Sequence, residues 1–100
     1  MEQISAGELS ERLNSGEVLN LLDVREVIEY HTYNIGGKNI PLSQVVANIN
    51  QLNYNKTDEI IVICKAGIRS KTACILLMQN GYEQVKNVTG GLLALQRLKQ

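Results

Sequence analysis

Three short apolar segments, each followed by a segment with the pattern of a helix, constrain the fold of this 100-residue chain most strongly. Segments 18–22 and 60–63 are almost wholly aliphatic, and segment 84–88 carries valines among polar residues, so we interpret all three as strands. Strands that alternate with helices form parallel sheets, because each crossover packs its helix on one face of the sheet. The order of the elements therefore predicts an α/β fold, with helices on both faces of a mostly parallel sheet.

Capping and turn residues mark the remaining elements. Ser5 and Glu8 have the spacing of a capping box, and Gly16 can end the helix that they begin, which predicts a helix over 6–15. The other predicted elements are, in chain order, a helix over 27–32, a brief edge strand over 39–41, a helix from Ser43 to about Leu52, a helix over 69–80 and a terminal helix after Gly91.

The composition limits the classes of function. The formal net charge is zero and no basic block occurs, so neither nucleic acid nor a membrane surface is an expected partner. The longest apolar run, 73–78, is far too short to cross a bilayer, and the N-terminus lacks the pattern of a signal sequence. No linker-like stretch interrupts the chain, so we expect residues 1–100 to form one domain in the cytoplasm. Two cysteines and one histidine do not make a metal site.

The loop that starts at Cys64 is the strongest candidate site. Cys64 ends an aliphatic strand, and a helix begins after a six-residue loop, so the thiol faces the N–H groups and the positive dipole of a helix N-terminus. Lys65 and Arg69 add two cations, and Gly67 permits backbone angles that turn successive N–H groups inward. A cysteine at the end of a strand is otherwise a small core residue. Because two cations do not suit a core, we predict a reactive thiol.

The second cysteine, Cys74, is predicted to be a core residue. It shares a helical face with Ser70, Ala73 and Leu77, at spacings of three and four residues. Such a face of mostly small side chains lets a helix lie close on a sheet. Burial is also the usual fate of a free cysteine.

Asp23 follows its predicted strand as Cys64 follows its own. Ligands of open α/β sheets bind at the carboxyl ends of the strands, so both side chains are expected at one edge. If the two strands are neighbours, Asp23 can accept hydrogen bonds from N–H groups of the loop or pair with Arg69. Segment 23–26 also has the pattern of a helix start with acids in its first turn, and the two interpretations are compatible.

The length of the loop separates two chemistries. N–H groups that converge on a thiolate can hold a phosphate, as in cysteine phosphatases, or an extra sulfur atom with the small oxyanion that donates it. The phosphatase signature has five residues between its cysteine and its arginine, whereas this chain has four between Cys64 and Arg69. The tighter loop favours a persulfide. Phosphatase chemistry stays an alternative, although no acid stands within the loop to protonate a leaving alkoxide.

Four segments of the sequence resemble the rhodanese family, and together they span nearly the whole chain. Each is weak alone, but their shared order and spacing are typical of the family. They are Leu22-Asp23-Val24-Arg25-Glu26 with Glu29-Tyr30, Ile35-Gly36-Gly37-Lys38-Asn39-Ile40-Pro41-Leu42, the loop from Cys64 to Ser70, and Asn87-Val88-Thr89-Gly90-Gly91 with Ala94.

The resemblance implies a three-layer α/β/α fold with a five-stranded, mostly parallel sheet. It also implies that Cys64 is the catalytic residue of a thiosulfate sulfurtransferase. As a persulfide, Cys64 would carry sulfur from a small sulfur-containing anion to cyanide, a thiol or a sulfur-carrier protein, without a metal or an organic cofactor. The other residues marked are Lys65, Ala66, Gly67, Ile68 and Arg69 for substrate binding, and Asp23, Arg25 and Ser70 as supports of the loop.

Two details of the match bear on the substrates. Lys65 stands where members that prefer thiosulfate often have arginine, so the charge is kept and the planar fork of the guanidinium is lost. Segment 35–42 is similar to rhodanese domains appended to enzymes that activate ubiquitin-like sulfur carriers, which favours a protein as acceptor. A rhodanese-like module that binds a partner or relays sulfur without catalysis is a further alternative.

Overall fold

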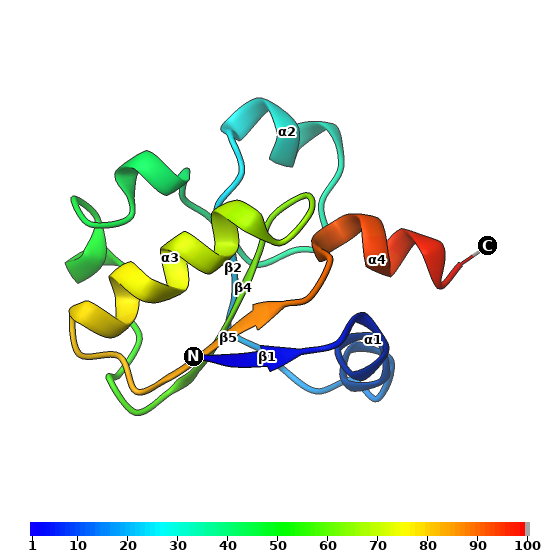
Figure 1. Ribbon diagram of the computed structural model, residues 1–100, viewed down its shortest axis with the longest axis horizontal. Coiled ribbons are helices and arrows are strands. Elements are labelled where there is room, and N and C mark those ends of the chain that lie inside the picture. Colours follow the sequence, from blue (N-terminus) through cyan, green and yellow to red (C-terminus); the bar gives the residue numbers. More distant parts are fainter. Residues whose placement is uncertain (100) are drawn as a thin grey trace.

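The computed structural model describes residues 1–99 and contains a five-stranded parallel sheet in the order β1-β5-β4-β2-β3 (Figure 1). The strands are β1 (Glu2–Ile4), β2 (Leu21–Asp23), β3 (Lys38–Asn39), β4 (Glu59–Ile63) and β5 (Gln84–Val88). The helices are α1 (Ala6–Asn14), α2 (Val27–Thr32), α3 (Ile68–Gln79) and α4 (Gly91–Arg97), with 3-10 turns η1 (Leu42–Gln44) and η2 (Ile49–Gln51). The predicted α/β class is confirmed.

The alternation of side chains along the central strand β4 divides the core in two. Val62 and the residue after the strand, Cys64, belong to the cluster beneath α3, whereas Ile61 and Ile63 belong to the cluster beneath α1 and α4. Figure 1 shows α3 on one side of the sheet and α1 with α4 on the other, and α2 lies beyond the carboxyl ends of the strands. The three-layer arrangement is therefore confirmed, and Cys64 faces α3.

The local signals for α1 and α3 are confirmed. The Ser5 hydroxyl accepts a hydrogen bond from the Glu8 N–H, so Ser5 caps α1, which begins at Ala6. The predicted small face of α3 is buried, and its residues are Ser70, Ala73, Cys74 and Leu77. The close approach of α3 to the sheet brings its first turn over the end of β4.

The structure differs from the predicted elements in several places. The helix predicted from Ser43 to about Leu52 is wrong, because η1 and η2 occupy that stretch. There the backbone N–H and the side chain of Asn48 both donate to the Gln44 carbonyl, so one helical hydrogen bond forms, but the chain does not continue as an α-helix. Strand β2 starts at Leu21 instead of residue 18. Strand β1 was not predicted, since its three residues are mostly polar and pair with β5 only at the edge of the sheet.

Two further observations concern residues 1–99. No helix within them has both the length and the apolar character needed to span a membrane. The same residues contain no cluster of three or more His, Cys, Asp or Glu side chains arranged to hold a metal ion.

Candidate active site

The sulfur of Cys64 lies beneath the first turn of α3 and is surrounded by hydrogen-bond donors. Its Sγ accepts from the Gly67 N–H at 3.2 Å and from the Ser70 N–H at 3.3 Å, and the Ser70 hydroxyl oxygen lies 3.2 Å away. The residue is 1% exposed. The loop therefore holds this sulfur in a buried but polar site.

Contacts with α4 explain why the loop amides face the sulfur. The first turn of α4 donates from Leu92 N to the Cys64 carbonyl and from Leu93 N to the Lys65 carbonyl, each at 3.0 Å. These bonds turn two loop carbonyls toward α4, which leaves the following N–H groups free to point inward. Gly67 completes the turn with φ +94°, a conformation that side chains with a Cβ rarely adopt.

Hydrogen bonds, more than nearby cations, set the ionisation of Cys64. Burial acts to raise its pKa, but the Ser70 hydroxyl and the N–H groups of Ser70, Gly67 and Ala66 outweigh burial and lower it. Neither Lys65 nor Arg69 is among these main causes, which differs from the role expected from their charges. The loop backbone therefore provides most of the stabilisation of a thiolate.

Asn87 on β5 bonds both to the middle of the loop and to the first turn of α3. Its Oδ1 accepts from the Ser70 hydroxyl at 2.5 Å, and its Nδ2 donates to the Gly67 carbonyl at 3.2 Å. The side chain is buried, with 4% of the residue exposed. Sequence analysis placed Asn87 only within a matching segment and gave it no role. A polar residue on the strand beside the central one is the signal that marks it.

Arg69 pairs with Glu29 of α2. Its two terminal nitrogens reach the two carboxylate oxygens at 2.7 and 3.0 Å, which is a bidentate ion pair. This arrangement lowers the pKa of Glu29 to about 2, chiefly through Arg69. The expected pair of Asp23 with Arg69 is wrong, because residue 29 reaches the guanidinium from α2. Sequence analysis missed this role of Glu29.

Asp23 and Arg25 support α2 instead of bonding to the loop amides. Their buried ion pair is 2.7 Å long. From the same guanidinium, Arg25 donates to the carbonyls of Glu29 and Tyr33, at the C-terminal end of α2. Since Glu29 in turn holds Arg69, the pair supports the loop indirectly. Strand β2 pairs with β4, so the two strands that end in Asp23 and before Cys64 are neighbours, as the sequence analysis considered.

The other loop residues predicted to bind substrate differ in exposure. Lys65 and Ala66 are exposed, and Ile68 is 76% exposed. The Ile68 side chain therefore lies outside the core, and Ala66 contributes its N–H to the sulfur. Lys65 lines a cavity beside the loop.

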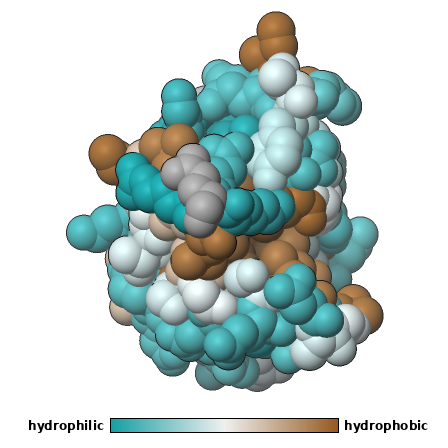
Figure 2. All heavy atoms as spheres, turned by 90° about the vertical axis from the view of Figure 1, so that its right-hand side faces the viewer, coloured by the Kyte–Doolittle hydropathy of each residue, from teal (hydrophilic) through white to brown (hydrophobic). Residues whose placement is uncertain are grey.

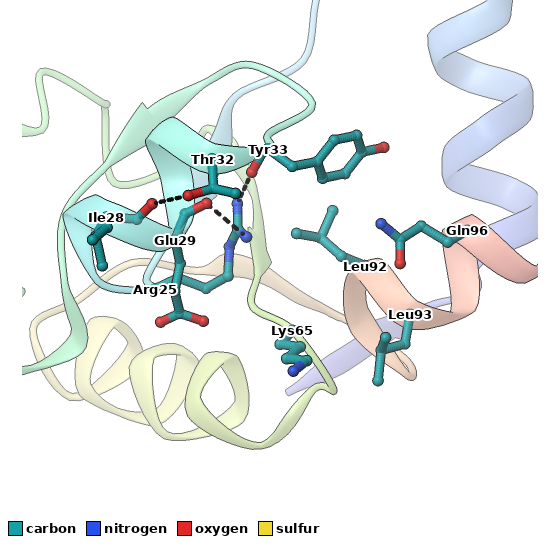
Figure 3. Close-up of a pocket in the computed structure, with 9 residues that line it drawn as sticks. All are labelled: Arg25, Ile28, Glu29, Thr32, Tyr33, Lys65, Leu92, Leu93 and Gln96. Atoms are coloured by element: carbon teal, nitrogen blue, oxygen red, sulfur yellow. Dashed lines mark hydrogen bonds between the residues drawn. The ribbon is translucent and has the colours of Figure 1, made fainter.

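That cavity lies between α2 and α4 and has a volume of about 300 Å³. Figure 3 shows residues of α2 on one side of it, residues of α4 on the other, and Lys65 below them. On the face viewed from the α4 side, apolar side chains lie among mostly hydrophilic ones (Figure 2). A second cavity, of about 230 Å³, has Glu26 and Arg69 in its wall. An acid therefore lines each cavity, Glu29 in the first and Glu26 in the second.

Comparison with known protein families identifies this arrangement. A profile described as "Rhodanese-like domain" matches residues 5–98. The chain belongs to the rhodanese family. Two curated relatives of this rhodanese domain are informative. It is 31% identical over 98 residues to a "Sulfurtransferase" of Allochromatium vinosum, covering 97% of this chain and 90% of the relative. It is 41% identical over 91 residues to the "Putative sulfur carrier protein YrkF" of Bacillus subtilis, covering 90% of this chain but 48% of that protein, about half its length.

Solved structures agree with this family assignment. The crystal structure of a rhodanese-like domain protein from Staphylococcus aureus superposes with a TM-score of 0.84 at 30% identity, covering 95% of this chain and 91% of that one. A solution structure of a rhodanese-like domain from Anabaena gives 0.87 at 28% identity, covering 98% of this chain and 75% of that one. The rhodanese fold expected from the matching segments is thus confirmed.

The two cysteines of this rhodanese domain are chemically distinct. Cys74 is fully buried in the cluster beneath α3, as predicted. Burial raises the pKa of its thiol to about 12. Of the two thiols, Cys64 is therefore the better suited to nucleophilic chemistry.

Proposed function

We propose that this chain is a sulfurtransferase in which Cys64 carries a sulfane sulfur as a persulfide. The observation that carries the proposal is the set of N–H and hydroxyl groups around Cys64 Sγ, which favours the thiolate despite burial. The rhodanese family assignment and the relative named sulfurtransferase support it. The proposal treats residues 1–100 as one catalytic unit.

In the first half-reaction, the Cys64 thiolate attacks the outer sulfur of a donor such as thiosulfate. The new sulfur–sulfur bond forms as the donor's bond breaks, and sulfite leaves with the electron pair. The negative charge then resides on the outer sulfur of the persulfide. The inward N–H groups of the loop can stabilise that anion as they stabilise the thiolate.

In the second half-reaction, an acceptor takes the outer sulfur. Cyanide or a thiolate attacks it, the bond to Cys64 breaks, and the thiolate is regenerated with no net oxidation or reduction. Gly67, Ala66 and Ser70 act through their N–H groups at the sulfur. In this proposal the Lys65 ammonium attracts an anionic donor from the cavity that it lines.

A protein acceptor, and hence a role in sulfur relay, fits two observations. The relative YrkF is named as a sulfur carrier, and the open cavity between α2 and α4 adjoins the loop through Lys65. A relay differs from the small-molecule reaction only in the acceptor. Both require the same persulfide on Cys64.

The test is sulfur transfer from thiosulfate to cyanide, measured as thiocyanate, together with the mass of the protein after exposure to several sulfane donors. We expect turnover and one added sulfur on Cys64. Cys64→Ser should lower turnover by at least about three orders of magnitude, whereas Cys74→Ala should keep it. Absence of both turnover and added sulfur would refute the proposal. Hydrolysis of an aryl phosphate that disappears in Cys64→Ser would instead favour the phosphatase alternative.

A further inference from the structure

The Ser70 hydroxyl has one proton and two neighbours that can accept it. Its oxygen lies 3.2 Å from Cys64 Sγ and 2.5 Å from Asn87 Oδ1. With Cys64 as a thiol, the S–H donates to the Ser70 oxygen, and the Ser70 hydroxyl donates to Asn87. A thiolate has no proton to give and is a charged acceptor, which binds a donor more strongly than a neutral amide does. Ionisation therefore changes which neighbour the hydroxyl prefers.

The surroundings of Asn87 fix the orientation of its amide. Nδ2 donates to the Gly67 carbonyl at 3.2 Å and to Gln3 Oε1 at 3.3 Å. A backbone carbonyl only accepts, so the flipped amide would place two oxygens against each other at Gly67. Oδ1 must therefore face Ser70, and Asn87 has no proton to offer the hydroxyl oxygen.

We propose that the Ser70 proton alternates between Asn87 in the thiol and Cys64 in the thiolate, which makes Asn87 a positioning residue that restrains ionisation of Cys64. When Cys64 loses its proton to solvent, the hydroxyl turns to the sulfur and the buried Oδ1 loses its donor, which offsets part of the gain. When a persulfide carries the charge on its outer sulfur, the hydroxyl returns to Asn87. This last step alone rests on the proposed function.

The charged and titratable groups around the loop do not bond to this hydroxyl. They are, element by element, Arg69 and Cys74 on α3, Lys65 in the loop, Glu29 on α2, and Asp23 at the end of β2 with its partner Arg25. Strand β5 and helix α4 contact the loop through uncharged groups, namely Asn87, Gly90 and Gly91. Among residues 1–99, the hydrogen-bond partners of the Ser70 hydroxyl are Cys64 and Asn87.

A double-mutant cycle isolates this effect from looser packing of the loop. The pKa of Cys64 is measured from the rate of alkylation against pH, with Cys74→Ala in every variant so that one thiol reports. Asn87→Ala should shift the pKa of Cys64 downward by about half to one unit more when Ser70 is present than in the Ser70→Ala background. An equal shift in both backgrounds would mean that Asn87 acts through Gly67 alone and would overturn the proposal.

Gln3→Ala is the matched control, because it removes a contact of Asn87 on the Nδ2 side and leaves Oδ1 untouched. It should not change the pKa of Cys64. If the buried variants do not fold, the side-chain carbonyl carbon of Asn87 can be followed by NMR in the unsubstituted protein. Its resonance should titrate with the midpoint of Cys64, and a resonance that ignores this ionisation would refute the alternation. Neither measurement needs a sulfur donor. The proposal about Asn87 can therefore fail or succeed independently of sulfur transfer.

Discussion

Cys64 and Cys74 lie in the same core cluster, ten residues apart in the sequence, and the pKa values of their thiols are shifted in opposite directions. Both residues are at most 1% exposed. Burial raises the pKa of Cys74 to about 12. Around Cys64, burial is opposed by the Ser70 hydroxyl and three backbone N–H groups, and the pKa falls below its ordinary value. Solvent exposure therefore does not separate the reactive thiol from the structural one.

The difference arises from position on α3. Cys74 lies two turns into the helix, where backbone N–H groups are bonded to carbonyls of the preceding turn. Cys64 lies before the first turn, where N–H groups have no helical partner and can donate to sulfur. Any change that removes these donors should make Cys64 more like Cys74.

Gly67→Ala should have the largest effect on this contrast. An alanine with φ near +94° costs about 1–2 kcal/mol, and its Cβ would meet Gly90 N at 3.2 Å and Val88 O at 3.3 Å. The loop must shift and weaken the N–H bond to sulfur. We expect the pKa of Cys64 to rise by about one unit and sulfur transfer to fall about tenfold or more.

The matched control for this variant is Gly16→Ala. Gly16 has φ +81°, but a Cβ there would meet nothing within 4 Å. Gly16→Ala should lower stability through a similar backbone strain and leave the pKa of Cys64 unchanged. An unshifted Cys64 in Gly67→Ala, measured by alkylation against pH, would contradict the role given to the loop amides.

Glu29→Gln should sharpen the contrast and change the choice of donor. The carboxylate is held by Arg69 and by the Glu26 N–H, so an incoming anion must compete with a fixed negative charge. Its removal should increase kcat/KM for thiosulfate about three- to tenfold at low ionic strength, with less gain at high salt. The pKa of Cys64 should fall slightly, while that of Cys74 stays.

Glu17→Gln is the control for Glu29→Gln, because it removes the same charge from an ion pair with Arg12 of α1. It should not change thiosulfate kinetics. A decrease in kcat/KM for Glu29→Gln, or a gain that ignores salt, would show that Glu29 mainly holds Arg69 in place.

Lys65→Ala should have the smallest effect and leave the two thiols as different as before. The side chain is exposed and is not a main cause of the pKa of Cys64. We expect KM for thiosulfate to rise about two- to threefold, with kcat unchanged. Lys56→Ala is the control, because the Lys56 ammonium donates to the Asn80 carbonyl at the end of α3 that lies away from the loop. A loss confined to kcat would assign Lys65 to the chemical step.

Local patterns predicted much of the fold. The capping box of Ser5 gave the start of α1, and the small face around Cys74 gave the packing of α3. These local patterns failed where contacts between residues far apart in the sequence decide the structure. β1 exists through its register with β5, and the stretch predicted as one helix forms two separate 3-10 turns.

The candidate site divides in the same way. Cys64, Gly67 and Ser70 are near in sequence, and their chemistry follows from the strand, loop and helix that carry them. Glu29 and Asn87 come from α2 and β5, and only the packed structure shows that they reach Arg69 and Ser70. The charge of Arg69 could be read from the sequence, but its pairing with Glu29 could not.

The most direct test is the site of sulfur addition in the unsubstituted protein. Trypsin cleaves after Lys65 and Lys71, so the two cysteines fall on separate peptides that mass spectrometry can compare after exposure to a sulfane donor. The experiment is repeated at several pH values, and unfolded protein serves as the reference. In the folded protein, the peptide that contains Cys64 should gain one sulfur at neutral pH. The peptide that contains Cys74 should gain none until the chain unfolds. Equal addition to both thiols in the folded protein, or addition to Cys74 first, would contradict the account.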